Sequence, residues 1–265
     1  AAETGGGGSG SGEGLSAALW ADADVARLAR ASRDSGFLSA LGAGTLPKGN
    51  FAGYVAQDKF FLEAFARAYT LAINKLPAGD QQGILGFAAL VRGVVDELRL
   101  HASYAAKWGV DMSTVTPAPA CQSYVDFLMD VATDGARDAA ACAAAMVPCM
   151  RLYAFLGQSL RDANAPAGPY QEWVDTYADA GFEELAASLE AMLDRYAEGA
   201  SAKKVAELRA LYVKAMALFP KKPNGANPHG KNLWASSALS AVFWLNVPGG
   251  TREEQPDWFN DEELK

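Results

Sequence analysis

The sequence predicts an all-α protein, and three features support this prediction. Roughly a fifth of the 265 residues are alanine, the strongest helix former, whereas Ile73 and Ile84 are the only isoleucines, a residue type that favours strands. Prolines and glycines separate long segments in which apolar residues recur at helical spacing. No segment shows the alternation of apolar and polar residues that marks a half-buried strand. Since 50% of the residues are hydrophobic, the chain can bury a sizeable core.

The chain divides into three parts. Residues 1–14 are rich in glycine and serine, the composition of a flexible tail. Residues 15–218 carry one helical segment after another and are expected to form a single helical domain. Residues 219–265 are rich in proline and glycine, with scattered aromatics, and are expected to form an atypical, partly ordered tail.

Within the expected domain, prolines mark most helix boundaries because they lack an N–H and have a fixed φ. Short connections between helices predict antiparallel neighbours, and therefore a bundle. Pro148 is the exception, since it lies inside a helical segment and is expected to kink that helix just before Cys149. The expected helices span 15–32, 51–76, 81–108, 122–132, 136–163, 170–197 and 201–218.

Composition and charge exclude several classes of protein. The net charge of -8 argues against a general nucleic-acid binder, which needs a basic surface. No apolar run reaches the roughly 18 residues of a membrane span, so no membrane partner is expected. The only histidines are His101 and His229, too few for a multi-histidine metal centre. We therefore expect a soluble protein without a metal site.

The cysteines indicate a reducing compartment. There are three, with no CxxC pair: Cys121, Cys142 and Cys149. Cys142 and Cys149 would lie about 10 Å apart on one helix, too far for a disulfide. The cytoplasm is the expected location, with an organelle as the alternative.

Cys149 and Tyr153 form the most informative local pair. They are four residues apart, so a phenol and a thiol share one helix face. A nucleophilic cysteine needs a lowered pKa and partial exposure. On pattern alone, a small cysteine buried in an alanine-rich helix is the more common situation, and a nucleophile is the alternative.

Polar and aromatic residues on other helices give further candidates. Asp58 follows Gln57 and precedes Phe60 and Phe61, a setting that suits a pocket for a polar heterocycle; an exposed surface aspartate is the plainer interpretation. Glu97 and His101 have the i, i+4 spacing of a hydrogen-bonded pair, which favours helix packing over metal binding. Tyr124 and Tyr177 add hydroxyls on two more helices, and each alone is typical of a core or an interface.

Together these strings resemble one known family. The sequence is similar to the TenA-like (thiaminase II) proteins, which have the haem-oxygenase-like all-α fold. The similarity extends from the turn at residues 44–47 to Leu218, which is most of the chain. The matching strings are Gln57-Asp58 before an aromatic pair, Glu97 with His101, Pro117 to Tyr124, Val147 to Gly157 and Tyr170 to Phe182. The resemblance implies a haem-oxygenase-like helical bundle.

The string from Pro148 to Gly157 indicates which branch of the family the chain resembles. With Cys149 at the family's nucleophile position, the chain resembles the cysteine-containing branch of the family. It is most similar to the TenA-like domains of plant-type proteins that are fused to a thiamin monophosphate phosphatase. The resemblance thus implies a fused or partner phosphatase, and it also implies a homo-oligomer.

The resemblance implies a thiaminase II-type hydrolase of thiamin (vitamin B1) salvage. Such an enzyme cleaves the bond between the methylene carbon of an aminopyrimidine and its nitrogen leaving group, giving hydroxymethyl-pyrimidine. No cofactor or metal is implied, and the partner is a small-molecule pyrimidine substrate. Carried over by position, Cys149 adds to the ring, and Asp58 holds the ring nitrogen and the amine. Three tyrosines stack on or orient the pyrimidine and the thiol: Tyr124, Tyr153 and Tyr177. Phe61 stands where many relatives have tyrosine.

One departure from the family pattern affects activity. The last core helix of the family carries a glutamate shortly before an aromatic pair, as in ExxFW, and this acid transfers a proton at the leaving group. Residues 211–218 hold no acid, and the chain continues into Phe219 and Pro220. Losing a general acid typically costs about 100- to 10,000-fold in rate. Slow hydrolysis is therefore expected, and the alternative is a non-catalytic pyrimidine-binding module. A mispredicted or alternative gene end after Leu218 would also explain the missing acid, and the abrupt rise in proline content there favours this explanation. An oxidase-like member of the same fold is disfavoured because such sites are richer in histidine and arginine.

Overall fold

The computed structural model describes residues 14–108, 115–221 and 236–237, and it describes side chains within 14–99 and 115–219. In this part of the chain there are ten α-helices, one 3-10 turn and two strands of two residues each. The elements are α1 (Leu15–Trp20), α2 (Ala23–Arg33), α3 (Gly36–Gly42), α4 (Lys48–Ile73), α5 (Gln81–Trp108), α6 (Pro119–Thr133), α7 (Ala139–Asp162), η1 (Gly168–Tyr170), α8 (Gln171–Ala178), α9 (Ala180–Ala197), α10 (Ala202–Leu218), β1 (Pro220–Lys221) and β2 (Ser236–Ser237).

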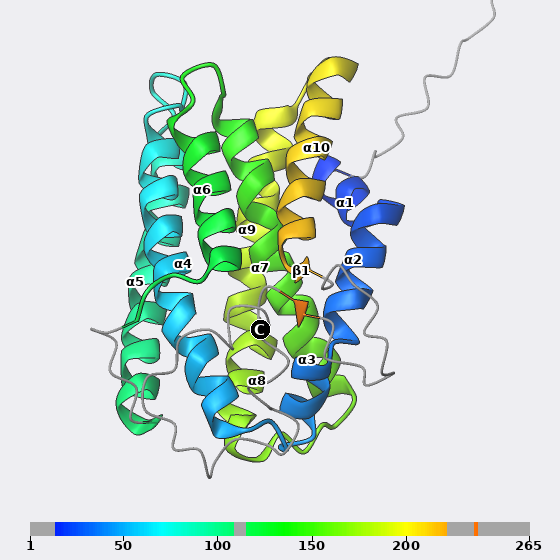
Figure 1. Cartoon of the computed structure of the whole chain (residues 1–265). Helices are drawn as coiled ribbons and strands as arrows, with labels where there is room; N and C mark the ends of the chain where they lie inside the picture. The colour runs from blue at the N-terminus through cyan, green and yellow to red at the C-terminus, as the bar shows by residue number, and fades with distance from the viewer. Residues whose placement is uncertain (1–13, 109–114, 222–235, 238–265) are drawn as a thin grey trace, which may run out of the picture.

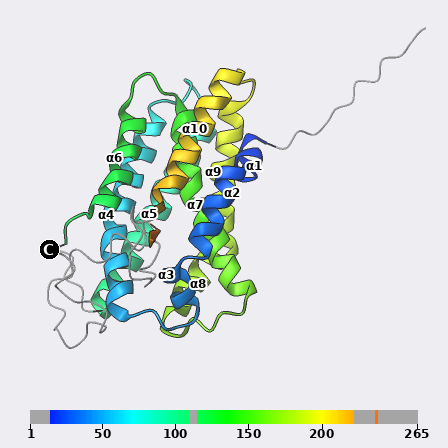
Figure 2. The same cartoon turned by 45° about the vertical axis from the view of Figure 1, so that its right-hand side comes forward.

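The long helices form a bundle, which confirms the all-α prediction. Helices α4, α5, α6, α7, α9 and α10 run along one common direction, with α7 in the middle (Figures 1 and 2). Helices α1 and α2 cover the side formed by α7, α9 and α10. The antiparallel pair β1–β2 is too short to form a sheet layer.

Several expected boundaries were wrong because local capping was overlooked. The segment 15–32 divides at Asp22, whose carboxylate accepts a hydrogen bond from the Asp24 N–H at 2.9 Å and starts α2. The segment 170–197 divides in the same way at Asp179, which caps α9. Helix α3 was not expected, and Ser35 caps it. Helix α6 begins at Pro119 and not at residue 122, because proline is well suited to the first helical position.

Helix α7 is the centre of the core. It packs against α4, α6, α8, α9, α10 and α2, and the residues from Ala139 to Pro148 are all buried. The run of alanines lets the neighbouring helices approach closely. Helix α7 is long and apolar enough to cross a membrane, but 83% of its most apolar window is buried inside the bundle, as in the core helix of a folded domain.

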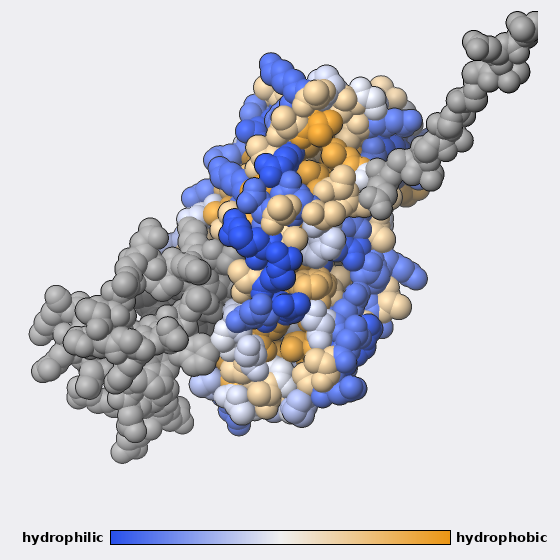
Figure 3. Space-filling view, turned by 90° about the vertical axis from the view of Figure 1, so that its right-hand side faces the viewer, coloured by the Kyte–Doolittle hydropathy of each residue, from blue (hydrophilic) through white to orange (hydrophobic). Residues whose placement is uncertain are grey.

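Polar contacts attach the outer helices to this core. The carboxylate of Asp194 on α9 accepts hydrogen bonds from the Ser16 N–H and hydroxyl, each at 2.7 Å, and so satisfies the start of α1. Arg209 on α10 pairs with Asp22 and Asp24 at the start of α2. The face that carries α1 and α2 has a band of hydrophilic side chains with hydrophobic ones between them (Figure 3).

Candidate functional site

The Gln57-Asp58 pair lies on the inner face of α4, and both side chains are buried. Gln57 connects α4 to the loop before α6: its Nε2 donates to the Thr116 carbonyl at 3.0 Å, and its Oε1 accepts from the Ala118 N–H at 2.9 Å. These bonds set the start of the helix that carries Tyr124. Asp58 faces the interior, so the interpretation as an exposed surface aspartate was wrong.

Asp58 is linked to a network of hydroxyls through Tyr54, one turn earlier on α4. Burial raises the pKa of Asp58 to about 7, and a hydrogen bond with Tyr54 opposes this rise only in part. Tyr54 also exchanges hydrogen bonds with Tyr153 and Tyr177, and its oxygen accepts from the Trp173 indole N–H at 3.3 Å. One phenol on α4 therefore connects the carboxyl to α7 and α8.

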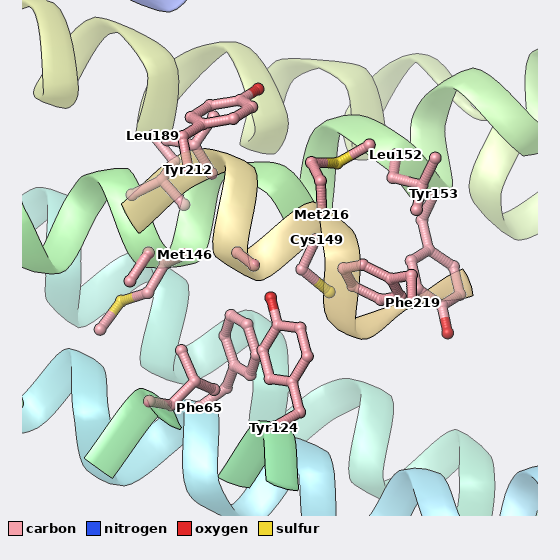
Figure 4. Close-up of a cluster of buried hydrophobic side chains, with 14 of the residues drawn as sticks. Phe65, Tyr124, Met146, Cys149, Leu152, Tyr153, Leu189, Tyr212, Met216 and Phe219 are labelled. Atoms are coloured by element: carbon pink, nitrogen blue, oxygen red, sulfur yellow. The ribbon is translucent and has the colours of Figure 1, made fainter. Parts of the chain in front are cut away.

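Cys149 lies on α7 between this hydroxyl network and an aromatic wall formed by Phe61, Tyr124 and Phe219. Its sulfur points toward the hydroxyl of Tyr124 and lies beside the ring of Phe219 (Figure 4). Burial, then the charges of Asp58 and Glu97, raise the pKa of the thiol well above its usual value. The lowered pKa of an activated nucleophile is therefore not found, and the thiol rests protonated. A base must take its proton before it can react.

Tyr124 and Phe61 form the aromatic wall together with Phe219. The ring centroids of Phe61 and Tyr124 are 4.6 Å apart, and those of Tyr124 and Phe219 are 5.1 Å apart. Phe219, the first residue after α10, also contacts Tyr153 at 6.4 Å between centroids. The end of the last helix thus contributes an aromatic ring beside the thiol.

Tyr153 and Tyr177 form the opposite wall. Their ring centroids are 4.8 Å apart, and Trp173 packs on Tyr177 at 4.7 Å. The Tyr177 hydroxyl donates a 2.6 Å hydrogen bond to Glu97 on α5. Glu97 was expected to pair with His101, whose side chain lies outside the described residues. In the described part of the structure, Glu97 bonds to a residue of the site, Tyr177.

Two buried hydroxyls in this region make no hydrogen bond within the described protein. They belong to Tyr69 on α4 and Tyr124 on α6. The charge of Cys149 contributes, after burial, to the raised pKa of both phenols, so both lie near the thiol. Buried hydroxyls usually find a partner, and a pair beside a thiol marks a place where a polar ligand can bind.

The six residues singled out in the sequence come from four helices, α4, α6, α7 and α8, and gather around one thiol. Sequence reasoning missed Tyr54, Tyr69 and Phe219. The first two had a detectable signal, because Tyr54, four residues before Asp58, and Tyr69, eleven residues after it, lie on the same helix face as Asp58. Phe219 had none, because it was assigned to the tail. Among the described residues, no three His, Cys, Asp or Glu side chains gather as a metal site would require.

Comparison with known families gives one clear match. The sequence model of the TENA/THI-4/PQQC family matches residues 36–221. The bifunctional TH2 protein, mitochondrial, of Arabidopsis thaliana is 33% identical over 69% of this chain. The aminopyrimidine aminohydrolase of Halalkalibacterium halodurans is 31% identical over 67% of this chain and 80% of its own length. The chain spans only 33%, 20% and 26% of the first three curated relatives it matches, all of which are longer proteins.

Solved structures agree with the sequence match. A TenA family transcription regulator from Silicibacter sp. superposes with a TM-score of 0.68 at 26% identity, over 77% of this chain and 90% of its own. A TenA homologue from Pyrococcus furiosus superposes with a TM-score of 0.70 at 20% identity, over 77% and 95% of the two chains. The fold is therefore the haem-oxygenase-like helical bundle.

Proposed function

The chain belongs to the TENA/THI-4/PQQC family, and on that premise we propose that it is an aminopyrimidine hydrolase of thiamin salvage. It would hydrolyse the methylene C–N bond of an aminopyrimidine, with hydroxymethyl-pyrimidine as the product. Support comes from a relative named aminopyrimidine aminohydrolase, of which this chain covers 80%. The observation that carries the proposal is the placement of Cys149 between Asp58 and a set of tyrosines.

Asp58 would bind the pyrimidine. With its pKa raised to about 7 by burial, it is a neutral acid in about half of the molecules near pH 7. A neutral carboxyl presents one O–H donor and one carbonyl acceptor side by side. An aminopyrimidine presents the complementary edge, a ring nitrogen that accepts and an exocyclic amine that donates. The hydrogen bond to the ring nitrogen would also draw electrons from the ring.

Cys149 would then attack that ring. In the proposed sequence, Sγ loses its proton and bonds to a ring carbon, and the electron pair gained by the ring expels the amine from the methylene carbon. The departing nitrogen takes up a proton and leaves as ammonia. Water adds to the methylene carbon, the C–S bond breaks, and Sγ regains a proton. One water is consumed, and hydroxymethyl-pyrimidine and ammonia are formed.

The walls of the site would hold the pyrimidine for this reaction. Tyr124 and Phe61 on one side and Tyr153 and Tyr177 on the other offer aromatic faces for stacking. The hydroxyl of Tyr124, which makes no hydrogen bond within the described protein, would find a partner in the ligand. Phe61 has no hydroxyl and contributes only its ring.

The test is hydrolysis of aminomethyl-pyrimidine by the purified chain, followed by chromatography of the hydroxymethyl product and by ammonia release. Cys149→Ser should abolish turnover, while Cys142→Ser, at a buried site two turns away on the same helix, should leave it unchanged. Equal turnover by the unmodified chain and the Cys149→Ser variant would show that the proposed nucleophile is wrong.

A non-catalytic pyrimidine-binding module is the second candidate. One observation favours it: the end of the last helix, where the family carries an acid, presents the apolar ring of Phe219 to Cys149. Calorimetric titration together with the product assay distinguishes the two, since such a module would bind hydroxymethyl-pyrimidine and yet release no product from the substrate.

Partners and location are also proposals. A relative named bifunctional TH2 protein, mitochondrial, supports a second, fused activity and an organellar location, and we propose that the second activity is the phosphatase that the sequence resemblance implies. The three cysteines are free, as a reducing compartment would allow. Light scattering of the purified chain would test for a homo-oligomer.

A further inference from the structure

The proton donor for the leaving group is the missing part of the proposed mechanism. At the end of α10, Phe219 lies beside the Cys149 sulfur, and Met216, about one turn earlier, extends toward Leu152; both are buried and apolar (Figure 4). If Phe219 takes the first aromatic place of ExxFW, Met216 takes the place of the glutamate. Neither side chain can give or accept a proton, so this helix contributes no acid to the site.

A carboxylate enters the site from another helix. Glu97 extends from α5, is partly buried, and accepts the 2.6 Å hydrogen bond from the Tyr177 hydroxyl. Tyr177 lies 4.8 Å, between ring centroids, from Tyr153, which is one turn after Cys149 on α7. Glu97 is therefore hydrogen-bonded to the wall that Tyr177 and Tyr153 form beside the thiol, and it does not point to the outer surface of the bundle.

Three acidic groups on three different helices are affected by the charge of Glu97. Burial and then Glu97 raise the pKa of Tyr177 on α8. Burial, Cys149 and then Glu97 raise that of Tyr69 on α4. Burial, Asp58 and then Glu97 raise that of Cys149 on α7. A carboxylate that influences all three lies close to the site, as its hydrogen bond to Tyr177 also shows.

The other carboxyl near the thiol has a different task. Within the described part of the chain, the two carboxyls that raise the pKa of Cys149 are Asp58 and Glu97. Asp58 is hydrogen-bonded to Tyr54 and is assigned to the pyrimidine edge. While Asp58 is hydrogen-bonded to the pyrimidine ring, it cannot also donate a proton to the leaving group on the methylene carbon. Glu97 is the remaining carboxyl.

We propose that Glu97 is the proton-transfer residue of this chain and replaces the acid that the last helix lacks. The proposal rests on the proposed hydrolase function. The Glu97 carboxylate takes the thiol proton as Sγ bonds to the ring, and it gives that proton to the amine nitrogen as the C–N bond breaks. It takes one proton from the attacking water and returns it to Sγ as the C–S bond breaks. Glu97 donates each proton that it accepts, so Glu97 and Cys149 return to their starting protonation states.

The leaving group provides a test that a structural role would not satisfy. An amine must gain a proton to leave, whereas the thiazolium nitrogen of thiamin departs as neutral thiazole and needs none, so with thiamin Glu97 releases the thiol proton to water. Glu97→Gln should therefore lower kcat on aminomethyl-pyrimidine by about 100-fold or more with little change in KM. On thiamin the loss should be smaller, about 10-fold, because only the proton transfers at sulfur and water are affected.

Two further variants complete the experiment. Asp96→Asn is the matched control, because Asp96 is the neighbour of Glu97 on α5 and pairs at the surface with Arg92 and Arg99. It should leave both rates unchanged. Met216→Glu, made in the Glu97→Gln background, supplies an acid from α10 and should recover part of the rate on aminomethyl-pyrimidine.

The outcomes separate this inference from the proposed function. If the unmodified chain hydrolyses neither substrate, the proposed function fails, and the inference fails with it. If the unmodified chain hydrolyses aminomethyl-pyrimidine and Glu97→Gln does so at the same rate, the inference alone is overturned. Equal losses on both substrates, with a raised KM and a lowered Tm, would make Glu97 a structural residue and would also overturn the inference.

Discussion

At Asp58, burial affects the carboxyl more strongly than its hydrogen bond to Tyr54 does. A pKa raised from 3.8 to about 7 corresponds to about 4 kcal/mol of unfavourable free energy once the group is charged. The folded state holds this proton more tightly than the unfolded state. The free energy of unfolding should therefore decrease as the pH rises from about 4 to about 7, and it should level off above that.

Asp58→Asn tests this linkage. The amide cannot ionise, so the variant should lose this part of the pH dependence and should be more stable than the unmodified chain at pH 8, by about 1–3 kcal/mol. Binding of hydroxymethyl-pyrimidine should weaken because the amide N–H is a poorer donor to the ring nitrogen than the carboxyl O–H. Urea unfolding at pH 5 and pH 8 measures the first effect. Parallel pH curves for the two proteins would contradict it.

Tyr69 gives a second prediction for a single residue. Its hydroxyl is buried and makes no hydrogen bond within the described protein, so Tyr69→Phe removes an uncompensated polar group. The variant should be as stable as the unmodified chain or more stable, by up to about 1 kcal/mol. If the hydroxyl serves the ligand, affinity for hydroxymethyl-pyrimidine should fall about 5- to 10-fold. Calorimetric titration and thermal unfolding measure the two effects; lower stability with unchanged affinity would contradict the prediction.

Among the elements, the contact between α7 and α8 determines where Tyr177 lies. Gly157 packs so closely on α8 that an added Cβ would lie 2.5 Å from the Tyr177 carbonyl carbon and 2.7 Å from the Ala178 nitrogen. Both contacts are with backbone, which cannot rotate away. Only a glycine lets the two helices meet at this point.

Gly157→Ala should therefore push α8 away from α7. We expect a loss of about 1–3 kcal/mol in the free energy of unfolding, together with weaker pyrimidine binding as Tyr177 moves from Tyr153. Gly49→Ala is the control, since an added Cβ there meets nothing within 4 Å, and it should be neutral or stabilising by up to about 1 kcal/mol. Urea denaturation curves of both variants measure the difference. A neutral Gly157→Ala would show that the helices can adjust.

Helices were easier to predict than their ends or the direction of individual side chains. Long apolar repeats predicted α4, α5, α7 and α10, because a helix that buries one face over several turns repeats apolar residues at helical spacing. The breaks at Asp22 and Asp179 depend on single side-chain hydrogen bonds, which leave no periodic signal. Glu97 is a similar case within the site: its spacing indicated a partner on its own helix, His101, whereas its hydrogen bond to Tyr177 on α8 joins residues 80 apart and leaves no sequence signal.

On the scale of the whole molecule, one core extends through the domain. Most buried apolar residues from Leu19 in α1 to Phe219 after α10 belong to one cluster, and only Ala118, Ala120 and Cys121 form a small second one. No helix in the described part has a separate core large enough to support it. The helical domain should therefore unfold in one cooperative transition, with an enthalpy of about 140 kcal/mol near 60 °C for roughly 200 residues. Differential scanning calorimetry tests this, and two resolved transitions would contradict it.

The position of α7 at the centre of the bundle has a consequence for the timing of hydrogen exchange. Its amides between Ala139 and Val147 are covered by neighbouring helices on several sides, so they should exchange with deuterium only when the whole domain opens. Cys149 lies on the same helix, just after this stretch. In the free protein, a bulky thiol reagent should therefore modify Cys149 at the rate of global opening, whereas a small reagent that enters the site should react much faster. The ratio of the two rates would measure how far the native domain admits small molecules without unfolding.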